Sequence, residues 1–109
     1  MEDLKRCLPE LKHILYDLDA VEREAYIKKA SSIIIQCINE IIINFLYSHK
    51  NGLNLNKTQI DRLKPYHTEM KKCVLTKTIA GKKKLLKNNL LNAVLTTIIE
   101  VVCDLEIEI

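Results

Sequence analysis

The sequence predicts an all-α fold: a compact bundle of about four helices with one long central helix. Apolar residues recur every three to four positions in four segments, which is the spacing of helices that bury one side. The chain has only 2 glycines and 2 prolines among 109 residues, whereas an all-β chain needs a turn about every ten residues. Hydrophobic residues make up 48% of the chain, so it can fill a core without metal or disulfide staples.

The first expected helix runs from Glu2 to Tyr16. Pro9 falls inside this segment, and proline removes a backbone donor and clashes with the preceding turn. The helix therefore either begins near Leu8 or is kinked there. One side of it is apolar and consists of Leu4, Leu8, Leu11, Ile14, Leu15 and Leu18.

The second expected helix is the long central one, from Ala20 to about Lys50. Asp19 is suited to cap its N-terminus, and Glu22 stands three residues later, where it completes a capping box. From Ile33 onward the segment is apolar nearly all round, which indicates burial on several sides. The pair Asn51-Gly52 is typical of a helix C-terminus.

The third expected helix begins after Asn56, with Gln59 at the capping-box position. Pro65 lies within it, so the helix is either kinked there or restarts with Pro65 in its first turn. Its apolar side is formed by Ile60, Leu63, His67, Met70 and Val74.

The fourth expected helix spans Ala80 to Val102, after a loop around Thr76 to Gly81. Lys82–Lys84 would crowd its first turn, where the helix dipole disfavours cations by about 0.3–1 kcal/mol each. Such a terminus becomes favourable when it binds an anion. The last residues, 104–109, alternate acidic and apolar; a frayed terminus is the preferred interpretation and an edge strand is the alternative.

Charge is segregated along the chain. The net charge is −2 over residues 1–48, +9 over residues 49–88 and −4 over residues 89–109, for a total of +3. We interpret residues 1–103 as a single helical domain that contains a basic segment, 49–88, and residues 104–109 as an acidic tail. Solubility requires surface charge but does not require its sorting by segment.

The basic segment predicts contacts with the phosphate backbone of nucleic acid. A solvated lysine face is the plain alternative, and an acidic protein or membrane surface is a third. Only five aromatic residues are present, and of these only Tyr66 lies in the basic segment, so base stacking has little support. The candidate contacts are Lys57, Arg62, Lys64, Lys71, Lys72, Lys77, Lys82, Lys83, Lys84 and Lys87.

Other functions find little support in the sequence. No glycine-rich phosphate loop or spaced catalytic set is present, so we expect a protein that is not an enzyme and uses no cofactor. The four cysteines and three histidines are scattered, which predicts no metal site. Cys37 and Cys73 lie on apolar stripes and are expected to pack as small hydrophobic residues. Reduced thiols, the absence of a signal peptide and the absence of a membrane-spanning stretch together predict an intracellular protein.

The segment from Ile35 to Leu86 resembles a family of small basic proteins encoded by Maverick/Polinton-class DNA elements and adintovirus-like viruses of animals. The resemblance rests on an I-x-x-I-x-E helix, a Leu-x-Leu link, a K-L-K-P-Y/H type segment and a lysine-rich K-K-K-x-L-L start. In this chain these are Ile35, Ile38, Glu40, Asn44 and Leu46, then Leu53 and Leu55, Arg62 to Tyr66, Lys71, Lys72, Lys77 and Lys82 to Leu86.

The resemblance implies a virion-core or genome-associated role, in the nucleus or virion of an infected host cell. Family members tend to continue into a glycine-rich hydrophobic tail, whereas here Asn88-Asn89 leads into a regular helix and an acidic end. A diverged or domesticated copy that contacts viral or host proteins is therefore an alternative.

Together these observations predict a non-enzymatic helical protein that binds nucleic-acid backbone without sequence specificity. The long second helix and the broad stripe of the fourth suggest more apolar surface than a monomer hides, hence a homodimer that is histone-like in its central helix. The rival function is a helical protein–protein interaction module with a solvated lysine face. If Lys57/Lys64/Lys71 and Lys82–Lys84 form one continuous positive surface, nucleic acid is favoured. If they are dispersed, or covered by the acidic tail, the rival is favoured. As an internal counter-charge, that tail would compete with phosphate.

Overall fold

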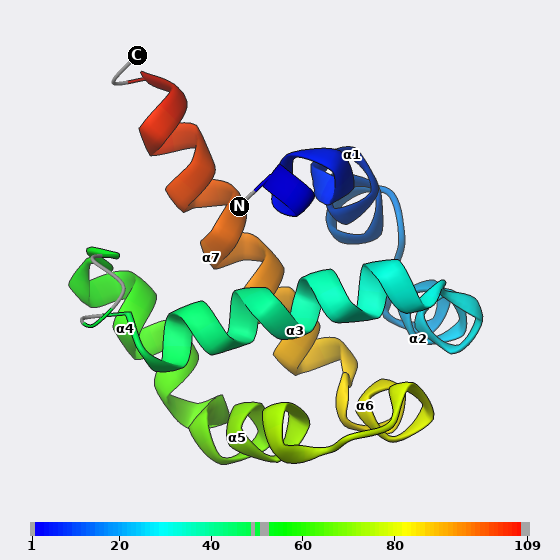
Figure 1. The fold of residues 1–109 in the computed structure, drawn as a ribbon. Coiled ribbons are helices and arrows are strands. Elements are labelled where there is room, and N and C mark those ends of the chain that lie inside the picture. The colour runs from blue at the N-terminus through cyan, green and yellow to red at the C-terminus, as the bar shows by residue number, and fades with distance from the viewer. Residues whose placement is uncertain (1, 49, 51–52, 108–109) are drawn as a thin grey trace.

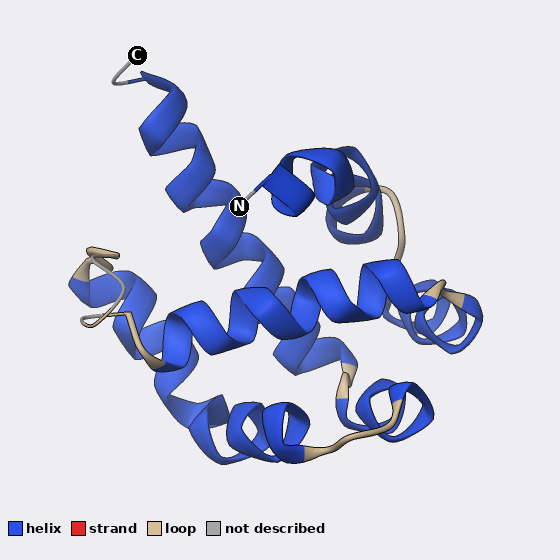
Figure 2. Cartoon of the chain, viewed as in Figure 1, coloured by secondary structure: helices blue, strands red, loops and turns tan. Residues whose placement is uncertain are grey.

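The computed structural model describes residues 2–48, 50 and 53–107, with side chains described between Leu4 and Val102 in those ranges. Every regular element among these residues is helical (Figure 2), which confirms the predicted all-α class. In chain order the elements are α1 (Glu2–Tyr16), α2 (Ala20–Lys29), α3 (Ser32–Leu46), α4 (Lys57–Leu63), the 3₁₀ helix η1 (Lys64–Tyr66), α5 (His67–Leu75), α6 (Ile79–Leu85) and α7 (Asn88–Ile107).

The prediction of one long central helix is wrong. The segment forms two helices, α2 and α3, which are bent by 114° relative to each other at the break. Ala30 has an extended backbone (φ −64°, ψ 149°), and the Ser31 hydroxyl then accepts from the backbone N–H of Ile34 as the N-cap of α3. Serine is a favoured N-cap because its oxygen satisfies an otherwise unpaired donor. A cap signal inside an apolar run therefore outweighs the continuous periodicity. The predicted C-cap pair, residues 51–52, lies outside the described residues.

The predicted third helix is also divided, here at Pro65. Proline is at the start of η1, so α4 ends at Leu63 and α5 begins at His67. This is the restart alternative, with proline in a first turn that needs no N–H from it. By contrast, α1 is one helix from Glu2 to Tyr16 that continues through Pro9, so the alternative in which it begins near Leu8 is wrong.

The predicted fourth helix is divided into α6 and α7, which meet at 93°. Thr78 caps α6 by accepting from the Gly81 N–H at 3.0 Å, so residues 79–81, predicted as loop, are already helical. At the other end, α7 continues to Ile107. Both predictions for the tail, the preferred frayed terminus and the alternative edge strand, are therefore wrong for residues 104–107.

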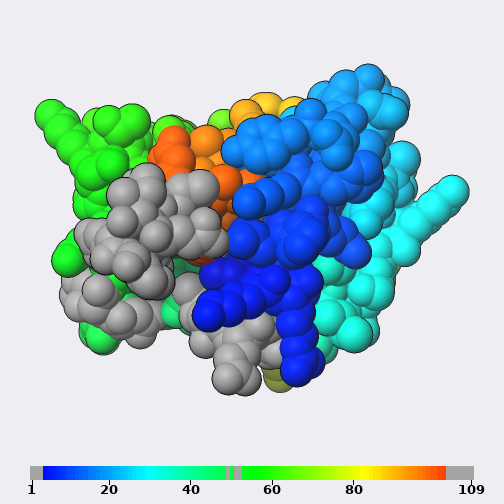
Figure 3. All heavy atoms as spheres, turned by 90° about the horizontal axis from the view of Figure 1, so that it is seen from above, coloured from blue at the N-terminus to red at the C-terminus, as the bar shows by residue number. Residues whose placement is uncertain are grey.

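The core is built around α3 and α7, which cross in the middle of Figure 1 with α1 on one side and α5 and α6 on the other. Seen from above, α7 lies between α1 and α4 (Figure 3), in agreement with its contacts to both. Ile35, Ile38, Leu91 and Ile98 are fully buried within one continuous cluster, and Cys37 and Cys73 belong to it as predicted. The radius of gyration, 13.1 Å, is that of a compact chain of this length.

Candidate nucleic-acid interface

The ten predicted contact residues fall into three groups in the structure. Lys82 is buried, with 8% of its surface exposed. Arg62 and Lys83 are half-buried, and each of them donates a hydrogen bond inside the protein. The exposed group consists of Lys57, Lys64, Lys71, Lys72, Lys77, Lys84 and Lys87.

The lysine cluster at residues 82–84 lies in the last turn of α6 and not in the first turn of a long helix. The sign of the dipole interaction is therefore opposite to the predicted one, since the negative end of α6 faces these cations. The proposed anion site at a helix N-terminus is wrong for these three residues, because the break at Leu86 separates them from α7.

Lys82 holds three helices together. Its Nζ donates to the Cys73 carbonyl at 2.7 Å, to Asn39 Oδ1 at 3.0 Å and to the Val74 carbonyl at 3.5 Å. These acceptors belong to α3 and α5, and two of them are carbonyls left unpaired at the end of α5. An ammonium has three protons to donate, so Lys82 is occupied internally and is not a phosphate contact. Burial raises the pKa of the Cys73 thiol, while the nearby Lys82 charge opposes this effect.

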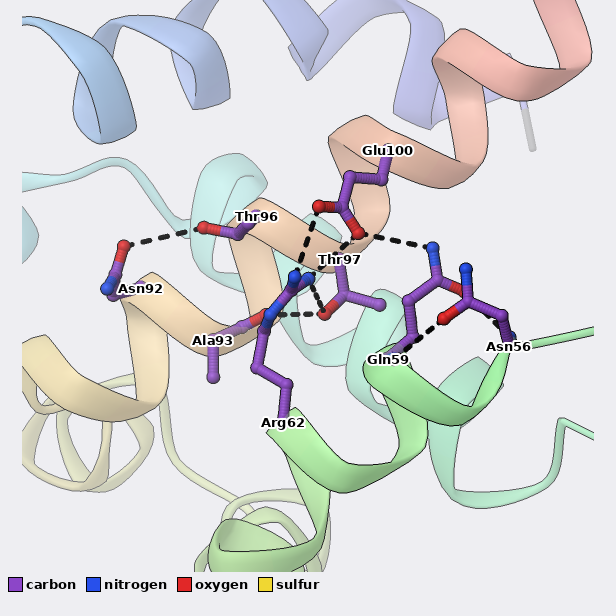
Figure 4. Close-up of polar contacts among 8 residues, drawn as sticks. All are labelled: Asn56, Gln59, Arg62, Asn92, Ala93, Thr96, Thr97 and Glu100. Atoms are coloured by element: carbon purple, nitrogen blue, oxygen red, sulfur yellow. Dashed lines mark hydrogen bonds and ion pairs between the residues drawn. The ribbon is translucent and has the colours of Figure 1, made fainter.

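Arg62 is also committed to the fold, at a contact between α4 and α7 (Figure 4). Its two terminal nitrogens donate to Glu100 Oε1 at 2.9 Å and Oε2 at 3.1 Å, which is the bidentate geometry that strengthens such pairs. Gln59 Nε2 donates to the same carboxylate at 3.2 Å, and Arg62 also donates to the Thr97 hydroxyl. The hydrogen bond from Arg62 is the main cause that lowers the pKa of Glu100, against the opposing effect of burial.

A third internal contact involves Arg23, which the sequence patterns did not single out. Its Nε and Nη2 donate to the carbonyls of Ile14 and Leu15, and its Nη1 donates to Asn88 Oδ1 at 2.8 Å. Arg23 thereby joins the end of α1 and the start of α7 to α2. No local pattern could reveal this, because Asn88 is 65 residues away in the sequence.

Three of the predicted contacts converge with a fourth lysine around one groove between α2 and α6, which lie next to each other in Figure 1. This α2–α6 groove has a volume of about 320 Å³. Lys28 comes from α2 and was not among the predicted residues. Nζ of Lys83 donates to the backbone carbonyl of Lys28 at 3.1 Å, which links the two walls. The lining residues are Glu24, Ile27, Lys28, Ala80, Lys83, Lys84, Leu86 and Lys87.

The remaining exposed lysines are spread over successive elements. Lys57, Lys64 and Lys71, expected on one helical face, belong to α4, η1 and α5 respectively. The elements α4 and α6 lie at opposite sides of the molecule in Figure 1, so Lys57 is remote from the α2–α6 groove. The structure thus brings together only part of the predicted basic surface, and the dispersal of Lys57, Lys64 and Lys71 counts in favour of the rival interaction module.

Residues 104–107 of the acidic tail, which continue α7, do not lie over the groove. Asp104 is 16 residues beyond Asn88 in the continuous helix α7, so its backbone lies about 24 Å along the axis from the end next to α6. Figure 1 shows the C-terminal end of α7 on the far side of α3 from α6. Residues 104–107 of the same chain are therefore too far from the α2–α6 groove to act there as the predicted internal counter-charge.

A second cavity, of about 350 Å³, lies where the end of α3 meets α4 and α5, and we call it the α3–α4 cavity. Ile60, predicted to be part of a buried stripe, is instead 50% exposed at this cavity. Its apolar lining residues are Phe45, Leu55, Ile60, Leu63 and Met70.

Two further properties concern the described residues. No three His, Cys, Asp or Glu side chains among them are grouped so that they could hold a metal ion. None of their helices, taken singly, has the length and apolar content to cross a membrane.

In comparisons with known proteins, no protein-family model, curated protein or solved structure matches this chain significantly.

Proposed function

We propose that this protein binds the phosphate backbone of nucleic acid without reading base sequence. The observation that carries the proposal is the convergence of Lys28, Lys83, Lys84 and Lys87 on the α2–α6 groove. Neutralisation of phosphates by lysine supplies sequence-independent affinity through the release of counterions. The exposed lysines of α4, η1 and α5 would add contacts along the same strand or a neighbouring one.

The resemblance to core-type proteins of Maverick/Polinton-class elements supplies a context for this proposal. A virion-core or genome-associated protein packages its own genome and has no need of base recognition. In that context the protein acts in the nucleus or virion of an infected host cell, as a non-enzymatic component.

The test is binding of a labelled random-sequence duplex over a salt series. We compare the wild type with the double variant K84E/K87E, in which both altered residues are exposed lysines of the groove. K5E/R6E is the matched control, because it makes the same charge change at exposed residues of α1. Lys82 is left unchanged, since its substitution would test folding and not binding.

If two phosphate contacts are lost, the slope of log K against log salt should become less negative by about 1.8, at 0.9 for each contact. The control should keep the wild-type slope. Equal effects in the two variants, or no binding by the wild type at about 50 mM salt, would refute the proposal.

A helical protein–protein interaction module is the second candidate, and the α3–α4 cavity favours it. Ile60 is half-exposed beside an apolar lining, as in a groove that accepts an apolar side chain of a partner helix. I60E should then abolish retention of a specific partner, whereas L75E, at an exposed leucine of α5 away from the cavity, should not.

The homodimer stays a prediction, but its original reason no longer holds. The apolar stripes of α3 and α7 that suggested it are buried inside one chain, and the interrupted second helix removes the histone-like analogy. Sedimentation equilibrium at high micromolar concentration would decide between a monomer, which the burial favours, and a dimer.

A further inference from the structure

The α2–α6 groove combines a charged rim with an apolar floor. Four lysines line it against a single carboxylate, that of Glu24. Ile27 and Leu86, which are 1% and 3% exposed, close it from the core side, and the small side chain of Ala80 leaves its space open. Four cations gathered on so small a space repel one another unless an anion is present.

The groove is held in shape by contacts that do not involve a ligand. Lys83 joins α6 to the backbone of α2, and Arg23 joins α2 to the start of α7. A site formed in advance binds with less loss of conformational entropy than one ordered by its ligand.

The size of the groove limits what can enter it. About 320 Å³ is near the lower end of the range for small-ligand sites, about 300–1,000 Å³, which suits a segment of one nucleotide and excludes a double helix. In a duplex the bases are stacked inside, so only phosphates could reach the lysines at the rim. An unpaired strand can in addition place a sugar and base against Ala80 and the methylene stems of the lining lysines.

We propose that the α2–α6 groove binds one nucleotide of an unpaired strand, with its flanking phosphates on Lys28, Lys84 and Lys87. Its sugar and base would lie against Ala80 and the methylene stems of these lysines, which are the exposed apolar lining. This deepens the proposed function and rests on it. No aromatic side chain lines the groove, so the apolar contact does not distinguish one base from another. The protein should therefore prefer single strands to duplexes without preferring a sequence.

The experiment is fluorescence anisotropy with a random single strand of about 12 nucleotides and with the duplex of the same length. K28E reverses the charge of a lysine that lines the groove. K29E is its matched control, because Lys29 is the next residue of α2, is also exposed and does not line the groove. A80W fills the groove without a change of charge, at a residue that is exposed and so tolerates bulk. Circular dichroism shows whether each variant is folded.

The wild type should bind the single strand about tenfold more tightly than the duplex, which is the gain expected when about 55 Å² of apolar surface is removed from water. K28E should weaken single-strand binding more than K29E does, and A80W should weaken single-strand binding while it leaves duplex binding unchanged. Tripolyphosphate should compete only at concentrations far above that of the oligonucleotide, because it lacks the sugar and base.

Four results would overturn the inference. Equal affinity for the two forms, with duplex binding still sensitive to K84E/K87E, would refute the single-strand site and leave the proposed function standing. Unchanged single-strand binding by A80W would place the strand elsewhere. Displacement by tripolyphosphate at concentrations comparable to the oligonucleotide would identify a site for free phosphate compounds. Failure of the wild type to bind either nucleic acid would overturn the inference together with the proposed function.

Discussion

Lys82 and Lys84 are two residues apart in the sequence, yet one ammonium group is buried among carbonyl oxygens and the other side chain is exposed. The difference arises from the helix, since residues two apart point in directions about 200° apart around α6. Lys82 therefore faces α3 and α5, where it satisfies acceptors at the end of a helix. A run of lysines in a sequence can therefore contain both a buried structural residue and an exposed one.

Lys82→Met should destabilise the protein by about 2–3 kcal/mol, because it leaves the Cys73 carbonyl and the Asn39 side chain without their buried donor. Urea unfolding measures this change. Lys84→Met removes the same charge from the same helix at an exposed residue and should change stability by less than about 0.5 kcal/mol. Equal effects of the two variants would show that Lys82 has no internal role.

Glu100 predicts a pH dependence of stability. Its pKa is lowered in the folded protein, chiefly by the hydrogen bond from Arg62, so the folded state binds fewer protons than the unfolded state near that pKa. The stabilisation is therefore present above the pKa of an unfolded glutamate, about 4.3, and is lost as the pH falls through the lower folded value.

Glu100→Gln should thus destabilise the protein at pH 7 by at most about 1 kcal/mol, since the pair is partly exposed and solvent screens it. Below about pH 4 the difference from the wild type should shrink. Urea midpoints from pH 3 to pH 7 give the comparison, and Glu40→Gln, at an exposed residue of α3, serves as the control. A difference that does not depend on pH would contradict the role of the ion pair.

At the scale of the elements, the local signals were informative. The two capping boxes, Asp19 with Glu22 and Asn56 with Gln59, are present with both of their hydrogen bonds. These interactions join residues three apart, so the sequence contains everything they need. The breaks at Ala30 and Leu86 were missed, because an apolar run can continue across a bend when both helices are buried in the same core.

Gly81 is a position where the packing of one element restricts the side chain. A Cβ there would lie 2.6 Å from Thr76 Cγ2 and 2.8 Å from Thr78 Oγ1. Neither threonine is free to move away, because the Thr76 hydroxyl donates to the Lys72 carbonyl and the Thr78 hydroxyl caps α6.

Gly81→Ala should therefore destabilise the protein by about 1–3 kcal/mol, although alanine is favoured over glycine in a helix by about 1 kcal/mol. Thermal unfolding reports the change. The double variant G81A/T76S should recover part of the loss, since serine lacks the methyl group that is in the way but retains the hydroxyl. A stabilised G81A variant would mean that the threonines move easily.

At the scale of the whole molecule, polar contacts decide how the short helices are arranged. Arg23, Arg62 and Lys82 each connect elements that are far apart in the sequence. Each of these three cationic side chains is buried or half-buried. The exposed lysines of the predicted set are distributed over α4, η1, α5, α6 and the loops on either side of α6. The net charge of a segment therefore overstates the charge available to a partner.

Deletion of residues 104–109 should leave nucleic-acid binding within about twofold at physiological salt. The start of the tail lies about 24 Å along α7 from its first residue, and charges separated by more than the screening length of about 8 Å interact weakly. Binding of the duplex by the truncated and full chains at 0.15 M salt tests this. Markedly tighter binding by the truncated chain would restore the counter-charge hypothesis, with the tail of a second copy as the competitor.

The sequence by itself determined the helical class, the presence of the first helix and both capping boxes, because each depends on residues within one or two turns of one another. At Pro65 the sequence left a kink and a restart open, and the structure has the restart. Only the tertiary structure decided which lysines are free to meet a ligand. Lys82 and Arg62 find acceptors 35 to 43 residues away, and Lys28 joins Lys83 across 55 residues. Packing of the apolar faces of α3 and α7 brings these residues together in space. The spacing of residues along the chain does not encode this long-range effect.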